Sequence, residues 1–205
     1  MTPPGSALPP AGSAPPALPP PPKPVSLVFV GPIQNPAAKN LRTACCNAAT
    51  QGVKEIQILF SSSGGFVDEG FALYNFLRAL PVKLSMHAIG YVDSMALPVF
   101  LAGEQRFCCP DSTFLFHDFG WGSTGPVSQT RSQWADLQES LERSAFRAKE
   151  LLKLRTTLTE QDFITLKLYE EATIKDASFA KEKGVVHEIK EALIPAGAIV
   201  ANIDF

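Results

Sequence analysis

The chain has 205 residues, of which 45% are hydrophobic and 19% charged, and this composition is typical of a globular protein with one domain. A net charge of -2 at pH 7 provides no broad basic surface, so we do not expect nucleic acid as a partner. No apolar run approaches the ~20 residues of a membrane span, and the N-terminus lacks a secretory signal pattern. We therefore expect a cytoplasmic protein with no membrane partner.

Four cysteines form two adjacent pairs, Cys45 with Cys46 and Cys108 with Cys109. Neighbouring cysteines are poorly placed to bridge each other, and the C-x-x-C spacing typical of zinc sites is absent. We therefore expect buried thiols in a reducing compartment, and neither a metal nor an organic cofactor.

Residues 1–24 contain eleven of the 18 prolines, mixed with Ala, Gly and Ser. Such a segment cannot bury a core and favours extended, polyproline-like conformers. We expect a disordered leader over 1–24 and a single domain over 25–205. The alternative for the leader is that it binds a partner with a proline-reading groove.

From residue 26 onward, short β-rich runs alternate with longer helical stretches, which predicts an α/β fold with a largely parallel sheet. Asn35 followed by Pro36 marks a helix start, Gly52 marks its end, and Pro98 restricts a later short helix because it cannot donate to the preceding turn. In chain order, the first expected elements are strand 26–31, helix 35–52, strand 54–60, helix 71–80, strand 82–90 and helix 93–102.

The second half of the chain continues the same alternation with longer helices. Two short strands flank the turn at Pro110, and a long charged amphipathic helix follows them. The expected elements are strands 106–109 and 113–117, helices 128–154, 159–170 and 176–183, and strand 185–189.

Two segments could supply parts of a site for acyl transfer, which needs a nucleophile, a base and donors for an oxyanion. Gly64 and Gly65 follow a strand, and glycines leave backbone N–H groups free to approach a ligand, although Gly-Gly is also an ordinary turn. Ser94 lies at a strand-to-helix junction, where the helix dipole favours an anionic oxygen. The alternative is that Ser94 or Asp93 only caps the helix.

The chain has three histidines, and one of them is a candidate base. His117 ends the β-rich run after Thr113, whereas His87 lies in the middle of a strand. His187 lies near the C-terminus beside Glu188, where solvent exposure is the simpler interpretation. A single strand histidine is more often structural than catalytic, and the combination with Ser94 is what favours a catalytic His117.

Taken together, these segments resemble the Clp protease proteolytic subunit family, a branch of the crotonase-like superfamily whose members repeat β-β-α units in a spiral. The resemblance covers 26–189, and 30 residues separate Gly64 from Ser94, as in the family. The residues that carry it are Ser62-Ser63-Gly64-Gly65 for the family's Ser-Pro-Gly-Gly, Gly90 to Met95 for Gly-x-x-x-Ser-Met, Pro110 to His117 for Pro-x-Ser-x-x-x-x-His, and Gly184 to Ile189 for Gly-Leu-Val-Asp-x-Ile.

The resemblance implies a serine peptidase that cleaves peptides or unfolded polypeptides and forms a homo-oligomer. It implies that Ser94 attacks the scissile carbonyl, His117 accepts its proton, and the N–H groups of Gly64 and Met95 hold the oxyanion. It also implies that a strand through Gly65, Phe66 and Val67 pairs with an extended peptide. The long helix 128–154 would protrude and build a subunit interface through Trp134, Leu137, Leu141 and Phe146, the alternative being that this stripe packs on its own core.

The chain departs from the family at the third catalytic residue. The position of the family's aspartate falls on Ala172, so we predict Glu171 as the acid beside His117. The alternative is that Glu170 and Glu171 are solvated carboxylates at a helix end. Ala172 also leaves open a catalytically silent subunit of a Clp-like ring, and a crotonase-type acyl-CoA enzyme is a third alternative, which the Ser94 and His117 pair disfavours.

Asp93 is a second departure, because the family usually has a small residue before the nucleophile. A carboxylate that pointed into the site would stabilise a protonated His117, and one that pointed away would only cap the helix. We prefer the second interpretation.

The leader occupies the place where the resembled family has an axial loop and a helix that shapes the docking clefts for a Clp ATPase. A polyproline-like segment is a poor substitute for a packed cleft wall. We therefore expect cleavage of peptides or already unfolded segments without dependence on a Clp ATPase.

Overall fold

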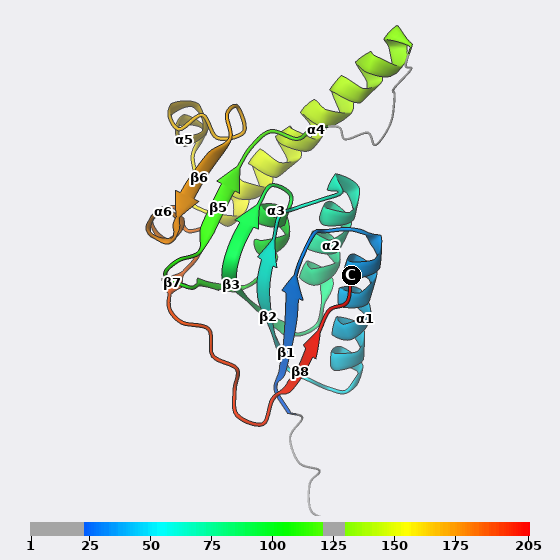
Figure 1. The fold of residues 1–205 in the computed structure, drawn as a ribbon, viewed down its shortest axis with the longest axis vertical. Coiled ribbons are helices and arrows are strands. Elements are labelled where there is room, and N and C mark those ends of the chain that lie inside the picture. The colour runs from blue at the N-terminus through cyan, green and yellow to red at the C-terminus, as the bar shows by residue number, and fades with distance from the viewer. Residues whose placement is uncertain (1–22, 121–129) are drawn as a thin grey trace, which may run out of the picture.

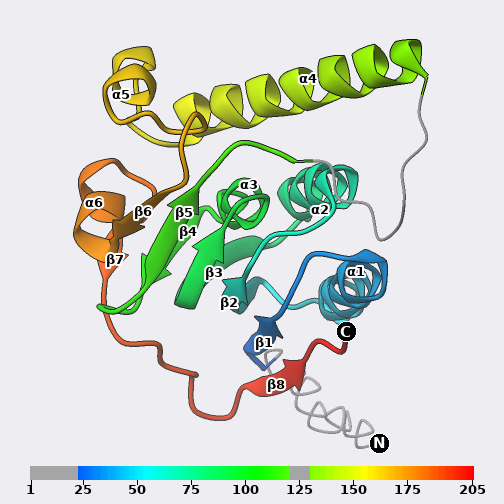
Figure 2. The same ribbon diagram turned by 45° about the horizontal axis from the view of Figure 1, so that its top comes forward.

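The computed structural model describes residues 23–120 and 130–205, and the strands in these ranges form one eight-stranded sheet with helices packed on it (Figures 1 and 2). The strands are β1 (Val25–Val30), β2 (Glu55–Ser62), β3 (Lys83–Asp93), β4 (Gln105–Cys108), β5 (Thr113–Phe116), β6 (Thr173–Asp176), β7 (Glu188–Ile189) and β8 (Ile199–Asn202). The helices are α1 (Asn35–Thr50), α2 (Val67–Ala79), α3 (Ala96–Phe100), α4 (Arg131–Arg155), α5 (Glu160–Thr165) and α6 (Ala177–Glu182).

The sheet has the order β6-β5-β3-β2-β1-β8, and β4 pairs with both β3 and β7. All of these pairs are parallel except β5 with β6, which is antiparallel. The predicted α/β fold with a largely parallel sheet is therefore confirmed. Parallel strands end at a common edge, and the segments of chemical interest follow β2, β3 and β5 there.

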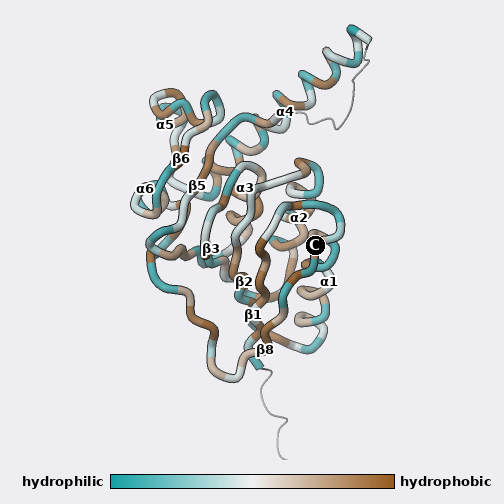
Figure 3. The backbone as a smooth tube through the Cα atoms, in the orientation of Figure 1, coloured by the Kyte–Doolittle hydropathy of each residue, from teal (hydrophilic) through white to brown (hydrophobic). Residues whose placement is uncertain are grey.

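The core lies between the sheet and helices α1, α2 and α3, which Figure 2 shows together on one side of the strands. Alternate residues of the strands face this core, and Phe29, Ile58 and Phe60 are completely buried. Each such side chain contributes roughly 1.5–3 kcal/mol on burial. Figure 3 accordingly shows β1 as a brown, apolar segment, whereas the projecting part of α4 has long teal and white stretches.

Strand β3 runs further than its sequence predicts, as far as Asp93. Its first half pairs with β2 and β4, and its last three residues pair with β5. The helix expected from 93 therefore begins only at Ala96, and its N-cap is Met95, which makes no side-chain cap bond. The interpretation of Asp93 as a helix cap is wrong, because strand pairing with β5 continues through that residue.

Helix α4 is the long helix that the sequence predicts, and it projects well beyond the sheet (Figures 1 and 2). Its predicted start at 128 lies outside the described residues, and its N-cap is Thr130. The buried side chains Ala148, Leu151 and Leu152 all lie in its C-terminal part. Leu141 and Ala145 also pack against this core, so its own chain supports α4 from Leu141 onward.

Two strands were not expected from the sequence. The helix predicted over 159–170 ends at Thr165, because Lys167 and Tyr169 take left-handed φ angles of 51° and 66° that turn the chain. This turn leads into β6, which pairs with β5. At the other end of the sheet β8 pairs with β1, and the Phe205 ring packs against Phe29 with ring centroids 5.0 Å apart.

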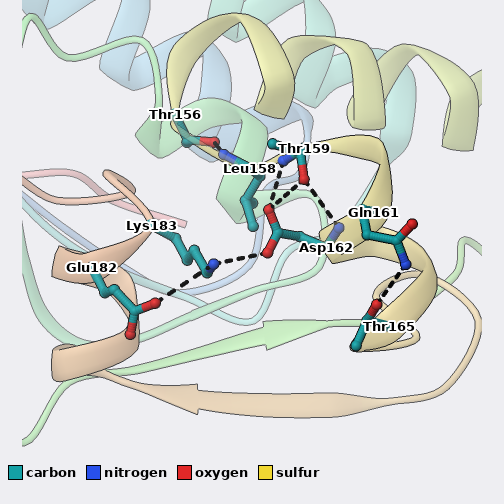
Figure 4. Close-up of polar contacts among 8 residues, drawn as sticks. All are labelled: Thr156, Leu158, Thr159, Gln161, Asp162, Thr165, Glu182 and Lys183. Carbon is teal, nitrogen blue, oxygen red and sulfur yellow. Dashed lines mark hydrogen bonds and ion pairs between the residues drawn. The ribbon is translucent and has the colours of Figure 1, made fainter.

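Polar contacts link the start of helix α5 to the end of helix α6, and a separate local bond joins Leu158 to Thr156 just after α4 (Figure 4). Thr159 and Asp162 form a capping box at the start of α5, and Asp162 Oδ1 accepts from Lys183 Nζ at 2.8 Å. The Lys183 ammonium and the bonds from Thr159 lower the pKa of the Asp162 carboxyl to about 2. These contacts hold α5 beside α6, on either side of the turn that leads into β6.

Three further expectations concern the leader, the cysteines and membrane-spanning helices. The predicted leader over 1–24 falls almost entirely on residues 1–22, outside the described residues. Cys45 and Cys108 are buried as expected, but Cys46 is exposed and Cys109 is partly exposed. Across 23–120 and 130–205, none of the helices combines the length and apolar character needed to cross a membrane.

Candidate active site

Ser94 occupies a strained turn between β3 and α3. Its φ angle is 56°, which is a left-handed conformation that costs a residue with a Cβ roughly 1–2 kcal/mol. The turn is held by two bonds, from the Ser94 N–H to the Leu115 carbonyl and from the Leu97 N–H to the Ser94 carbonyl, both 3.0 Å long. A strained strand-to-helix turn of this kind presents the nucleophile in many hydrolases.

Gly64 lies directly against this turn. Its φ angle is 83°, and a Cβ at this position would lie 2.8 Å from Ser94 Cβ and 3.0 Å from the Met95 nitrogen. Position 64 therefore requires glycine for both its conformation and its close contact. The structure thus brings together Ser94 and the two residues predicted to supply oxyanion donors, Gly64 and Met95. The Gly64 N–H donates to Ser62 Oγ at 3.2 Å, a bond that an oxyanion would have to replace.

The strand predicted through Gly65, Phe66 and Val67 is not formed, which corrects the sequence interpretation. Val67 is the first residue of α2, and the Phe66 N–H already donates to the Ile33 carbonyl at 2.9 Å. The chain turns into the helix because Gly65 lies tightly against Ile33, whose carbonyl oxygen would lie 2.1 Å from a Cβ at position 65. The Phe66 side chain, at the start of α2, is 67% exposed. Main-chain pairing of a peptide beside Gly65 stays a prediction.

His117 follows β5 and lies at the same edge of the sheet as Ser94. The β3–β5 register pairs Asp93 with Leu115, two residues before His117. Side chains alternate along a strand, so His117 lies on the same face of β5 as Leu115, opposite the buried Phe116. Within the described ranges, no hydrogen bond joins the side chains of Ser94 and His117. Bonds between catalytic groups are often long before substrate binds.

The residue that β6 places opposite His117 is an alanine. The antiparallel register pairs Phe116 with Thr173, and one further step pairs His117 with Ala172. Glu171 forms an ion pair with Lys167 at 2.6 Å, and 64% of its side chain is exposed. The structure therefore places the predicted third acid in a surface ion pair, and its catalytic role stays a prediction.

Asp93 is a carboxylate that the sequence interpretation assigned to a cap. It is half-buried at the end of β3, and burial raises the pKa of its carboxyl above the usual range. A hydrogen bond with the Leu115 backbone and the charge of His117 both act in the opposite direction on that pKa. The Asp93 carboxylate is therefore within electrostatic reach of His117, and the sequence signal for it was the charge next to the candidate nucleophile.

The other two histidines have structural contacts away from this edge. His87 is buried in β3, and its Nε2 lies 3.0 Å from the Lys190 carbonyl oxygen. His187 is exposed, as expected, and its Nδ1 accepts from the Arg106 N–H at 3.1 Å. No group of three His, Cys, Asp or Glu side chains is placed to hold a metal ion in the described parts of the chain.

A cavity of about 540 Å³ lies between the segment after His117 and helix α4. Its walls include Asp118, Phe119 and Tyr169 on one side and Leu141 on the other. Among the described residues, the Tyr169 hydroxyl is buried without a hydrogen-bond partner, and burial raises the pKa of Tyr169. Tyr169 was not expected here from the sequence, because its burial depends on β6 folding back beside β5. A second cavity, of about 580 Å³, includes Glu55 and Ser85 and so lies near the starts of the strands, at the opposite end of the sheet from Ser94.

The known proteins to which this chain is similar belong to one family. The model of the family described as Clp protease matches residues 25–192. The ATP-dependent Clp protease proteolytic subunit 3 of Rhizobium etli is 27% identical over 120 residues, which are 58% of this chain and 62% of that protein. The ATP-dependent Clp protease proteolytic subunit of Deinococcus radiodurans is 30% identical over 138 residues, which are 65% of this chain and 61% of that protein. The chain thus spans somewhat less than two thirds of the length of these relatives.

The fold has a solved counterpart. The structure of a mutant of ClpP1 from Listeria monocytogenes aligns with a TM-score of 0.70 at 20% sequence identity, over 82% of this chain and 91% of the other. This likeness supports the expected fold, the β-β-α spiral with a projecting long helix.

Proposed function

Because this chain belongs to the Clp protease family, we propose that it is a serine endopeptidase with Ser94 as nucleophile and His117 as general base. The observation that supports this most is the left-handed turn at Ser94, against which Gly64 packs closely, near both Ser94 and the Met95 nitrogen. A serine held in a costly conformation beside two backbone N–H groups is a feature of sites that stabilise an oxyanion.

In the proposed reaction, Ser94 Oγ attacks the scissile carbonyl carbon and its proton passes to His117. The N–H groups of Gly64 and Met95 hold the negative oxygen of the tetrahedral intermediate. His117 then gives the proton to the leaving amine as the C–N bond breaks, and water releases the acyl group from Ser94. Glu171 is the acid that the sequence predicts for His117.

The proposed substrates are peptides or unfolded polypeptides, bound in extended form beside Gly65 with the exposed Phe66 at the rim. We also propose a cytoplasmic homo-oligomer that does not depend on a Clp ATPase. A catalytically silent ring subunit is the second candidate, and the observation that favours it is Ala172 opposite His117.

Labelling with a fluorophosphonate tests the proposal, because only a serine with a nearby base and oxyanion donors reacts much faster than ordinary hydroxyls. The protein should be labelled at one site. Ser94→Ala and His117→Ala should abolish labelling, and His87→Ala and His187→Ala should leave it unchanged. Labelling that persists in Ser94→Ala would contradict the assignment of the nucleophile, and a correctly folded but unlabelled protein would favour the silent subunit.

A further inference from the structure

Asp93 and His117 lie on one face of two adjacent strands. Asp93 pairs with Leu115 across β3 and β5, so their side chains point to the same face of the sheet. His117 directly follows β5, and continuing the strand alternation one residue past Phe116 places it on the same face as Leu115. The charge of His117 acts on the Asp93 carboxyl and lowers its pKa, as expected for side chains this close in the fold.

The opposite flank of His117 offers no such carboxylate. Extending the β5–β6 register one residue past Phe116 and Thr173 places Ala172 across from His117, and Glu171 is paired with Lys167. Asp118 follows His117 directly, but its Oδ1 accepts the Phe119 N–H at 2.8 Å and it is exposed to solvent. Of the carboxylates near His117 in the described chain, Asp93 is the one that shares its face of the sheet.

The surroundings of Asp93 strengthen its effect on a neighbouring charge. The residue is half-buried between the fully buried Val92 and the strained turn at Ser94, so water screens its carboxylate less than it screens a surface group. Asp93 also has no capping role, because α3 begins three residues later. Its carboxylate instead interacts with the Leu115 backbone and with the charge of His117.

We propose, on the basis of the proposed peptidase function, that Asp93 is the positioning residue of His117 and replaces the acid that is absent at position 172. Its carboxylate favours the imidazolium that forms when His117 takes the proton of Ser94. Asp93 is also only two residues from Met95, so its negative charge opposes the negative oxygen of the intermediate. We therefore expect catalysis through Asp93 to be slower than with an acid at position 172.

The test compares four variants of the full chain by fluorophosphonate labelling rate and by kcat and KM for a short fluorogenic peptide. Asp93→Asn should lower the labelling rate and kcat roughly 10-fold or more, with little change in KM, because the carboxylate acts in the transition state. Glu171→Gln should lower both rates less than Asp93→Asn does, and Glu170→Gln should retain activity within about twofold of the unchanged protein. Asp111→Asn, in the exposed turn before β5, is the matched control for loss of one carboxylate.

A rescue experiment separates a positioning role from a structural one. Adding Ala172→Asp to Asp93→Asn supplies a carboxylate opposite His117 from another strand and should restore most of the lost rate. The melting temperature of Asp93→Asn should be equal to or above that of the unchanged protein, since the amide removes a partly buried charge. A structural role predicts the reverse, namely a lower melting temperature and no rescue.

The outcomes distinguish this inference from the proposed function. If the unchanged protein is labelled at Ser94 but Asp93→Asn reacts within twofold of its rate, Asp93 does not act on His117 and the peptidase assignment stands. Loss of rate in Glu171→Gln alone would assign the acid to Glu171 and overturn the inference. If the unchanged protein is not labelled at all, the peptidase function fails and the role of Asp93 fails with it.

Discussion

At the scale of single residues, the site depends on two adjacent left-handed conformations of different cost. Gly64 takes φ 83° at no steric penalty, and glycine is required there because Ser94 Cβ would otherwise be too close. Ser94 takes φ 56° with a Cβ, and the Leu115 carbonyl and Leu97 N–H hold it in place. Tertiary bonds therefore maintain strain at the residue that needs to be exposed to a substrate carbonyl.

This strain predicts a difference between two variants that both lack the nucleophile. Ser94→Gly should be more stable than Ser94→Ala by about 0.5–1 kcal/mol, because glycine relieves the left-handed penalty but loses more backbone entropy on folding. Chemical denaturation of both variants measures the difference. Equal stabilities, or a less stable Ser94→Gly, would mean that the turn carries little strain. Neither variant should react with a fluorophosphonate.

At the scale of elements, α5 and α6 hold the turn that carries β6 to its place beside β5. The capping box at Thr159 fixes the start of α5, and the pair of Asp162 with Lys183 links it to α6 (Figure 4). Both side chains of this pair are mostly buried, which distinguishes it from the exposed pair of Arg143 with Glu139 on α4. Partly buried, hydrogen-bonded ion pairs contribute more than exposed ones.

Asp162→Asn should therefore destabilise the protein by about 1 kcal/mol at pH 7, after allowance for solvent screening. The amide can still accept the Thr159 N–H, so the change tests the charge. Because the pKa of folded Asp162 is lowered to about 2 from its ordinary value of 3.8, its stabilisation is present above pH 4 and is lost as the pH falls towards 2. Asp162→Asn and the unchanged protein should therefore become equally stable as the pH falls from 4 towards 2.

Denaturation curves measured between pH 7 and pH 2 check this prediction. Glu182→Gln is the control, because Glu182 lies 3.5 Å from Lys183 but 72% of its side chain is exposed. A difference between Asp162→Asn and the unchanged protein that did not narrow below pH 4 would show that lost packing, not lost charge, is responsible.

At the scale of the whole molecule, helix α4 projects from the sheet, and the described side chains that pack on the core begin only at Leu141 (Figures 1 and 2). Phe146 is 63% exposed on this helix, and Trp134 is 49% exposed further out. Large aromatic side chains on a projecting helix are typical of a protein interface. This placement agrees with the proposed homo-oligomer, whereas Leu141 of the same stripe packs on the core of its own chain, as the alternative expected.

Phe146→Glu should shift the protein towards smaller species in sedimentation velocity at micromolar concentration, because a charge in a buried interface without a partner is costly. Ser140→Glu, also exposed on α4, is the matched control and should leave the distribution unchanged. If the unchanged protein sediments as a monomer, the proposed homo-oligomer is wrong. If the Phe146→Glu variant assembles normally, Phe146 on α4 is not part of the subunit interface.

Features that depend on local pattern could be predicted from the amino acids alone. Alternating strand and helix signals predicted the α/β fold and most element positions, and the family resemblance implied that Gly64, Ser94 and Met95, which the structure brings into contact, act together. Periodicity and turn chemistry are written in neighbouring residues, so such features are readable without the fold. The site motifs were readable because each is a short segment at the end of a strand.

Features that depend on pairing between distant segments emerged only in the folded chain. The left-handed residues Lys167 and Tyr169 turn the chain after α5 and lead into β6, and extending the β5–β6 register by one residue sets Ala172, not Glu171, opposite His117. Pairing with β5 extended β3 through Asp93 and turned a predicted cap into a carboxylate beside the histidine. A shift of one residue in register moves a side chain to the other face of a sheet, and no local pattern in this chain specifies that register.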